Sequence, residues 1–156
     1  MKLATFAAAL AIAAAPFAPA FAADLSYAGT WKVAAAVVAP WADPAVRKPD
    51  KAEPDELLGK SVTFKPGEVV GPQPFACKGA HYTVKEYTAD MLFQGAFGEM
   101  QAKNKSADPI KIAASLGFPA GPVKTLETGC EIDFHFADTT TAKVGLNDYV
   151  YTLKKQ

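Results

Sequence analysis

The sequence predicts a mainly β protein: a single antiparallel β-barrel or sandwich of about six to eight short strands, with one or two short helices. Short stretches alternate apolar and polar residues, which is the period of a half-buried strand. Turn-forming Pro, Gly, Asn and Asp residues separate these stretches. The 156 residues contain no internal repeat and only two cysteines, which favours one domain with one core.

Residues 1–23 have the pattern of a signal peptide. Lys2 precedes an apolar run that ends near residue 15, and small residues surround positions 20–23 as in an A-x-A cleavage site. Pro16 and Pro19 interrupt the run before about 20 apolar residues accumulate, which argues against a membrane-spanning helix. We therefore expect one domain over residues 24–156, located in the periplasm or secreted.

The first predicted strand covers residues 29–39, and the later strands are expected to close around it. Its alternation predicts one shared face, and Pro40 ends it because proline cannot donate to a sheet ladder. Residues 42–56 are rich in proline and charge, so they predict a long exposed loop. The side chains expected on the shared face are Trp31, Val33, Ala35 and Val37.

The remaining strands follow from the same alternation and from turn residues. Asn147 and Asp148 tolerate the left-handed backbone of a tight hairpin turn. Phe134 and its alternate neighbours form an apolar face, opposite a polar face of Glu131, Asp133 and His135. The predicted strands are residues 60–65, 68–70, 75–86, 123–127, 130–136, 141–146 and 149–154.

Two short helices are predicted between the central strands. Thr88 is placed to cap a helix over residues 89–94 that Gly95 ends. Asp108 followed by proline starts a second helix, which Gly117 ends. Residues 96–106, between the two, are predicted to be a loop.

Cys77 and Cys130 predict a disulfide, because an exported chain with an even, small number of cysteines usually pairs them. Such a bridge contributes at most about 4 kcal/mol in the chain-entropy model and requires Cα atoms about 4.4–6.8 Å apart. His81 and His135 follow the two cysteines, which raises the alternative of a metal site. Residues four apart on a strand are separated by about 13 Å, too far to share one ion, so no metal is predicted.

The first and last strands resemble those of lipocalins (calycins), which are small exported β-barrels. The resemblance lies in Gly29-Thr30-Trp31 and in the terminal Tyr151-Thr152-Leu153-Lys154. In lipocalins the Gly-x-Trp indole packs at the closed end of the barrel, beneath a basic residue near the last strand. The resemblance implies that Trp31 and Lys154 take these places, in a cation–π contact worth about 0.5–2 kcal/mol.

Charge and motifs narrow the classes of function. Lys and Arg number 16 and Asp and Glu 16, and the charges are scattered along the chain without a basic stripe. Nucleic acid is therefore not predicted as a partner, nor is membrane insertion once the leader is removed. Glu131, Asp133 and His135 share a strand face, which a solvated surface explains without chemistry, and no nucleophile motif is present. We expect no enzyme, no catalytic residues and no cofactor.

Two binding hypotheses remain open. In the first, an exported non-enzymatic protein binds a small apolar ligand with Trp31, Tyr82, Phe134 and Tyr151, although these rings could equally be core. In the second, the protein binds a periplasmic protein, for example as an inhibitor of a cell-wall hydrolase. Residues 42–56 and 98–108 would then be the contacting loops and Trp41 the aromatic anchor.

Overall fold

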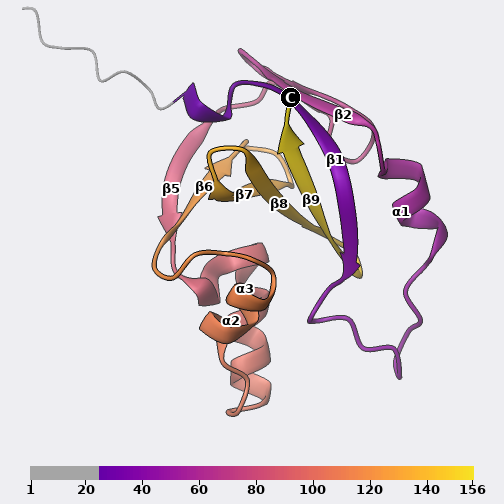
Figure 1. The fold of residues 1–156 in the computed structure, drawn as a ribbon, viewed down its shortest axis with the longest axis vertical. Helices are drawn as coiled ribbons and strands as arrows, with labels where there is room; N and C mark the ends of the chain where they lie inside the picture. The colour runs from indigo at the N-terminus through magenta and orange to yellow at the C-terminus, as the bar shows by residue number, and fades with distance from the viewer. Residues whose placement is uncertain (1–24) are drawn as a thin grey trace, which may run out of the picture.

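The computed structural model describes residues 25–156, so the predicted signal peptide (residues 1–23) lies outside the described residues. The mainly β prediction is confirmed: nine antiparallel strands form one sheet that curls into a half-barrel (Figure 1). The strands are β1 (Gly29–Val38), β2 (Ser61–Lys65), β3 (Glu68–Val70), β4 (Cys77–Lys78), β5 (Thr83–Tyr87), β6 (Val123–Glu127), β7 (Asp133–Asp138), β8 (Thr141–Leu146) and β9 (Tyr149–Lys155). The helices are α1 (Ala52–Leu57), α2 (Leu92–Lys103) and α3 (Pro109–Ser115), with short 3-10 turns at η1 (Leu25–Tyr27) and η2 (Ala89–Met91). Every helix in this part of the chain is too short or too polar to cross a membrane.

The strand order places the N-terminal strand in the middle of the sheet. It runs β4-β3-β2-β1-β9-β8-β7-β6-β5, so β1 pairs with β2 on one side and with the C-terminal β9 on the other. The predicted strand over residues 75–86 is two strands, β4 and β5. These two are consecutive in sequence but lie at opposite edges of the sheet. The curl brings both edges toward one seam, which β4 and β5 do not close by pairing.

A β-bulge divides β1 into two halves. Val33 pairs with Leu153 and Ala35 with Thr152, so Ala34 is the extra residue. Trp31 and Val33 are buried on the concave face of the sheet, but the bulge turns Ala35 and Val37 to the convex face, where Val37 is 49% exposed. The predicted common face is therefore wrong beyond Val33.

The concave face holds the main core. Its aromatic rings contact one another edge to face, as at Phe64 and Phe134, whose centroids are 4.8 Å apart. Trp31 is fully buried and its Nε1 donates to the carbonyl oxygen of Tyr27 at 2.8 Å. Leu57 of α1 is buried against the same cluster. Ring packing therefore fills the inside of the curl.

The convex face of β6 and β9 carries a helical layer at one end of the sheet (Figure 1). Phe93 and Phe97 of α2 and Phe118 after α3 form a second buried cluster with Val123 and Val150 of the sheet. This cluster is separate from the concave core. The molecule thus has two cores, one on each face of the sheet.

The helix starting at Asp108 is confirmed and its cap is the predicted one. The Asp108 carboxylate accepts from the backbone N–H of Ile110 at 3.0 Å and of Lys111 at 3.3 Å. Gly117, after the helix, has φ 84°, a conformation that favours glycine.

The prediction for residues 88–106 is only partly right. Thr88 precedes a short 3-10 turn but makes no side-chain capping bond. Phe93, Gln94 and Gly95 then form a left-handed turn, with φ of 52°, 59° and 83°. The right-handed helix continues from there to Lys103, so most of the predicted loop at 96–106 is helical. Gly95 marks the left-handed turn and not the end of the helix.

Candidate functional site

Three adjoining cavities form one groove along the residues that lead into β7, here called the β7 groove. Their volumes are about 170, 370 and 200 Å³, and Glu131 and Ile132 line all three. The first cavity lies beside Cys77 and Cys130 and the third beside Trp41. Because the cavities share these walls, they adjoin one another in a row that runs from the disulfide to the helical layer.

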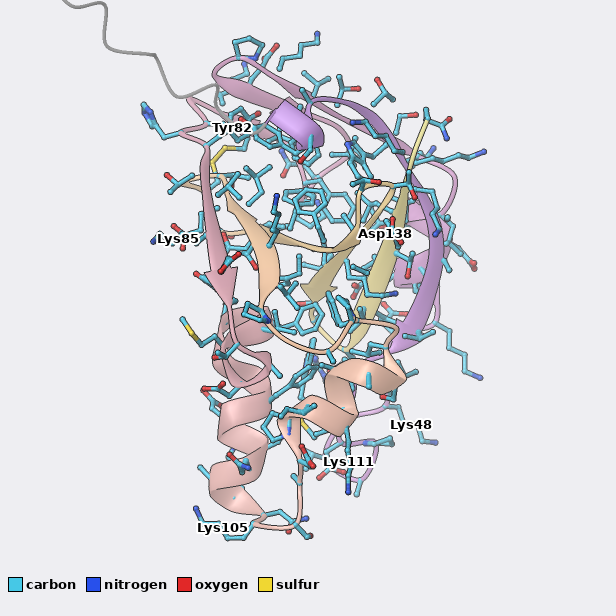
Figure 2. All side chains as sticks on the ribbon, turned by 60° about the vertical axis from the view of Figure 1, so that its left-hand side comes forward. Lys48, Tyr82, Lys85, Lys105, Lys111 and Asp138 are labelled. Carbon is cyan, nitrogen blue, oxygen red and sulfur yellow. A yellow bond between two sulfur atoms is a disulfide. The ribbon has the colours of Figure 1, made fainter. Side chains whose placement is uncertain are left out.

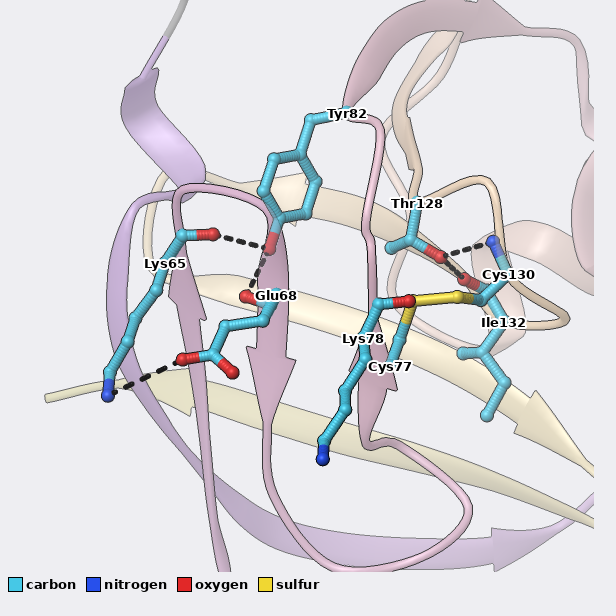
Figure 3. Close-up of a disulfide and its surroundings, with 8 residues drawn as sticks. All are labelled: Lys65, Glu68, Cys77, Lys78, Tyr82, Thr128, Cys130 and Ile132. Carbon is cyan, nitrogen blue, oxygen red and sulfur yellow. Dashed lines mark hydrogen bonds and ion pairs between the residues drawn. A yellow bond between two sulfur atoms is a disulfide. The ribbon is translucent and has the colours of Figure 1, made fainter.

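The disulfide fixes the first end of the groove (Figure 3). Cys77 of β4 and Cys130 are bonded, with Cα atoms 6.4 Å apart, so the predicted bridge and its spacing are confirmed. Thr128 holds the loop beyond: its hydroxyl donates to the carbonyl oxygen of Ile132 at 2.9 Å and accepts from the N–H of Cys130 at 3.2 Å. These bonds position Ile132 as the floor of the groove.

Tyr82, a predicted ligand-binding residue, lies where the two edges of the half-barrel approach each other. Its hydroxyl donates to the carbonyl oxygen of Glu68 at 2.6 Å and lies 3.0 Å from that of Lys65 (Figure 3). Burial is the main cause that raises the pKa of Tyr82. The backbone N–H of Ala80 donates to the carbonyl oxygen of Gly67 at 2.8 Å, next to β3, and the N–H of His81 donates to the carbonyl oxygen of Thr128 at 2.8 Å, next to β6. The segment between β4 and β5 thus ties the two edges of the half-barrel together.

His135 supports the other end of the groove from below. It is 1% exposed, and its Nε2 accepts from the backbone N–H of Phe93 at 3.0 Å. Because Nε2 accepts, Nδ1 carries the proton and donates to the Thr125 hydroxyl at 2.8 Å. Burial lowers the pKa of His135 to about 3, so the ring is neutral. The predicted solvated position of this side chain is therefore wrong, because α2 covers it.

The left-handed turn of α2 forms the wall above His135. Phe93 and Gln94 are non-glycine residues at positive φ, which costs roughly 1–2 kcal/mol each. The bond to His135 and a bond from Gln94 Nε2 to the carbonyl oxygen of Glu131, at 2.8 Å, hold the turn in place. Such strain is typical of functional segments. The turn presents the Gln94 side chain to two of the three cavities.

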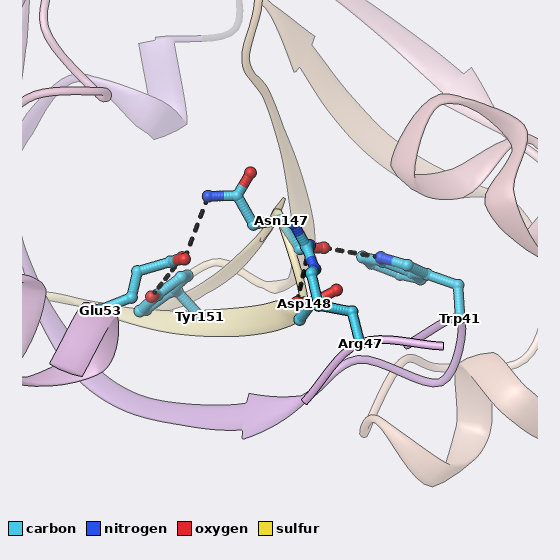
Figure 4. Close-up of polar contacts among 6 residues, drawn as sticks. All are labelled: Trp41, Arg47, Glu53, Asn147, Asp148 and Tyr151. Atoms are coloured by element: carbon cyan, nitrogen blue, oxygen red, sulfur yellow. Dashed lines mark hydrogen bonds and ion pairs between the residues drawn. The ribbon is translucent and has the colours of Figure 1, made fainter. Parts of the chain in front are cut away.

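The β8–β9 hairpin and the segment before α1 form the opposite wall (Figure 4). Trp41 Nε1 donates to the carbonyl oxygen of Asn147 at 2.9 Å, and its ring packs 5.2 Å from that of Phe93. Gly145 leaves room for both rings, since a Cβ there would lie 2.9 Å from each. Trp41 is thus built into the wall of the groove.

The predicted exposure of residues 42–56 is largely confirmed, although residues 52–56 belong to α1 and two side chains of the segment bond to this hairpin. Arg47 Nη2 lies 2.7 Å from Asp148 Oδ2. Glu53 of α1 accepts from Asn147 Nδ2 at 3.0 Å and from the Tyr151 hydroxyl at 2.9 Å (Figure 4). Burial, followed by the bond to Glu53, raises the pKa of Tyr151. The segment therefore serves as a strap over the hairpin.

The charged side chains that line the groove are acidic. Glu131 and Asp133 line it, and burial followed by the neighbouring Glu127 raises the pKa of Asp133. Glu127 itself is neutralised by Lys85, whose Nζ lies 2.8 Å away. Aromatic, aliphatic, amide and carboxylate groups meet here, an arrangement that suits an amphipathic ligand.

The structure brings some of the predicted site residues together and separates others. Trp41, Phe134 and both cysteines line the β7 groove. Trp31 and Tyr151 are fully buried in the concave core. Sequence reasoning missed Gln94, Ile132 and Asn147. The turn at Asn147-Asp148 could be recognised from the sequence. Its proximity to Gln94 in the same cavity could not, because the two lie far apart along the chain.

The end of β9 tests the residue assignment that the lipocalin resemblance implies. Lys155, which pairs with Trp31 across the strands, places its Nζ 5.6 Å from the indole centroid. Lys154 Nζ instead donates to the Thr141 hydroxyl at 2.6 Å, so the assignment of Lys154 is wrong by one residue. Comparisons of the chain with protein-family models, with curated proteins and with solved structures give no match. The lipocalin resemblance stays a prediction.

Proposed function

We propose that the protein is an exported, non-enzymatic binding protein that holds a small amphipathic ligand in the β7 groove. The observation that carries this proposal is that Glu131 and Ile132 line all three of the adjoining cavities. The apolar part of the ligand would contact Trp41 and Leu146. Its polar part would reach Gln94 and Glu131.

The packing of the concave core favours the β7 groove as the ligand site, and argues against a ligand inside the half-barrel. Trp31 and Tyr151 have no exposed surface, and Phe64 packs edge to face on Phe134. A ligand between these rings would have to displace buried aromatic contacts, each worth about 0.5–1.5 kcal/mol beyond area burial. The groove offers contact without that loss.

The test uses the neutral apolar dye N-phenyl-1-naphthylamine with two matched variants. Leu146→Glu places a charge in the β7 groove, whereas Ile110→Glu places one in a separate cavity of about 420 Å³ beside α3, where Ile110 is 66% exposed. The affinity for the dye, measured from its fluorescence, should fall at least tenfold in Leu146→Glu and stay unchanged in Ile110→Glu. Unaltered dye binding by a folded Leu146→Glu protein, checked by circular dichroism, would refute the groove.

A second candidate is the protein–protein role, an inhibitor of a cell-wall hydrolase. Its supporting observation is a cavity of about 540 Å³ between Trp41 and α2, lined also by Met100 and Lys103. In this role α2 would contact the partner together with the neighbouring segment 42–56. A cell-wall hydrolase should degrade isolated cell walls more slowly in the presence of the wild-type protein. Its rate should be restored when the Met100→Glu variant replaces the wild type. Equal hydrolysis with and without the protein contradicts this role.

A further inference from the structure

Three lysines that are scattered in the sequence meet on the convex face of the central strands. Lys32 of β1 lies directly opposite Lys154 of β9, and residues directly opposite each other point to the same face. On the next strand Thr141 lies opposite Lys154, and Lys143 opposite Thr152. Lys143 is therefore the diagonal neighbour of Lys154, also on this face. Folding thus creates a basic surface across β1, β9 and β8.

Hydroxyl groups hold two of these ammonium groups in place. Lys154 Nζ donates to the Thr141 hydroxyl at 2.6 Å and Lys143 Nζ to the Thr152 hydroxyl at 2.9 Å. An ammonium group carries three donors, so each retains N–H groups for another acceptor. The two side chains are therefore oriented before anything binds.

The positive charge of this surface is only partly balanced within the described residues. Lys32, Lys143 and Lys154 make no ion pair in residues 25–156. Asp138, labelled in Figure 2, attracts Lys154 and Lys143, so one carboxylate offsets part of the charge of three lysines and the surface stays net positive. Burial is the main cause that lowers the pKa of Lys143, with a smaller contribution from the neighbouring Lys154. Like charges opposite each other in a sheet are destabilising unless something compensates them.

We propose that Lys32, Lys143 and Lys154 form a binding site for a phosphate group. A carboxylate offers two acceptor oxygens, whereas a phosphate group offers more of them to three separate lysines. Lysine binds phosphate as a point charge, and three such charges suit a compact anion with several acceptor oxygens. The phosphate can be free or can belong to a lipid headgroup.

The test compares two double variants that remove the same net charge. Lys32→Gln/Lys154→Gln removes the opposed pair, and Lys48→Gln/Lys105→Gln removes two exposed lysines that lie near the helical end of the molecule (Figure 2). In the first arm, inorganic phosphate is compared with chloride at equal ionic strength. In the second arm, vesicles of phosphatidylglycerol are compared with vesicles of phosphatidylcholine, and bound protein is measured by sedimentation.

The expected result is binding by the wild type and by Lys48→Gln/Lys105→Gln, and at least tenfold weaker binding by Lys32→Gln/Lys154→Gln. Phosphate that raises the thermal midpoint identifies a free anion as the ligand. Binding confined to phosphatidylglycerol vesicles identifies a lipid headgroup. The proposal is overturned if the wild type binds in neither arm, or if both double variants weaken binding equally, because net charge alone would then explain it.

Discussion

The concave core and the helical layer on the opposite face are stabilised in different ways. In the concave core, aromatic rings such as Phe64 and Phe134, which carry no titratable group, contact one another. The helical layer is joined to the sheet by a hydrogen bond from Phe93 to a buried, neutral His135. Mild acid should therefore leave the packing of the concave core unchanged but weaken the attachment of the helical layer to the sheet. The two sides should therefore fail under different conditions.

Removing the largest ring from the concave core gives the largest expected effect. Trp31→Ala should lower the free energy of unfolding by about 3–5 kcal/mol, because it leaves a cavity among buried rings. Val37→Ala, on the convex half of the same strand, should change it by less than about 0.5 kcal/mol. Urea unfolding followed by circular dichroism measures both. Equal losses would show that the bulge does not separate the two halves of β1.

Breaking the disulfide should weaken the seam side of the concave core. Cys77→Ser should cost about 2–4 kcal/mol, since the bridge closes a long loop in the unfolded chain. Reductant should destabilise the wild type by a similar free energy, seen as a lower thermal midpoint, and should leave the midpoint of Cys77→Ser unchanged. A midpoint insensitive to reductant in both proteins contradicts the stabilising role.

Acid should act on the helical layer through His135. Its folded pKa of about 3 lies below the ordinary 6.5, so the unfolded chain binds the extra proton first as pH falls. Stability from this group is fully present above pH 6.5 and is lost as pH falls toward 3. Between pH 6 and 4 the wild type should lose about 2–3 kcal/mol more than His135→Gln, which keeps an acceptor but does not titrate.

Comparing the wild type with His135→Gln also controls for the other groups that titrate in this pH range. Glu127 and Asp138 also have lowered pKa values, from Lys85 and Thr140 respectively, so their contributions fall with pH in both proteins and cancel in the difference. Urea midpoints across this pH range supply the comparison. Parallel pH curves for the wild type and His135→Gln would mean that His135 is not held neutral.

The smallest expected effect is local to the helical layer. Asp108→Ala removes the cap of α3 and should cost about 1 kcal/mol, while Asp108→Asn should cost a few tenths because it still accepts from the first turn. Amide hydrogen exchange should rise within α3 and stay unchanged in β1. Faster exchange in β1 would show that the two sides unfold as one unit.

Short-range signals in the sequence predicted most of the sheet and one helix. The alternation before and after Asn147-Asp148 gave the hairpin, and Asp108 with its following proline gave α3. Two features escaped. The bulge after Val33 has no marker among the alanines, and the helix after Gly95 follows a left-handed turn that is held by His135, a residue 40 positions away.

The candidate site was predictable only in part. Cys77 and Cys130 could be paired by counting cysteines, and Trp41 stood out beside a polar stretch. The groove itself depends on the curl of the sheet, which brings the hairpin tip to Gln94 and Ile132. Alternation along one strand carries no information about such distant neighbours.

The central position of β1 has a consequence for how the chain folds. Its partner β9 ends at Lys155, and the N–H of Gln156 donates to the carbonyl oxygen of Thr30 at 2.9 Å, so the pairing joins nearly opposite ends of the chain. Contacts of such long sequence separation raise the contact order, and folding slows because loop-closure entropy must be overcome first. The middle of the sheet cannot assemble until the last seven residues before Gln156 have been synthesised.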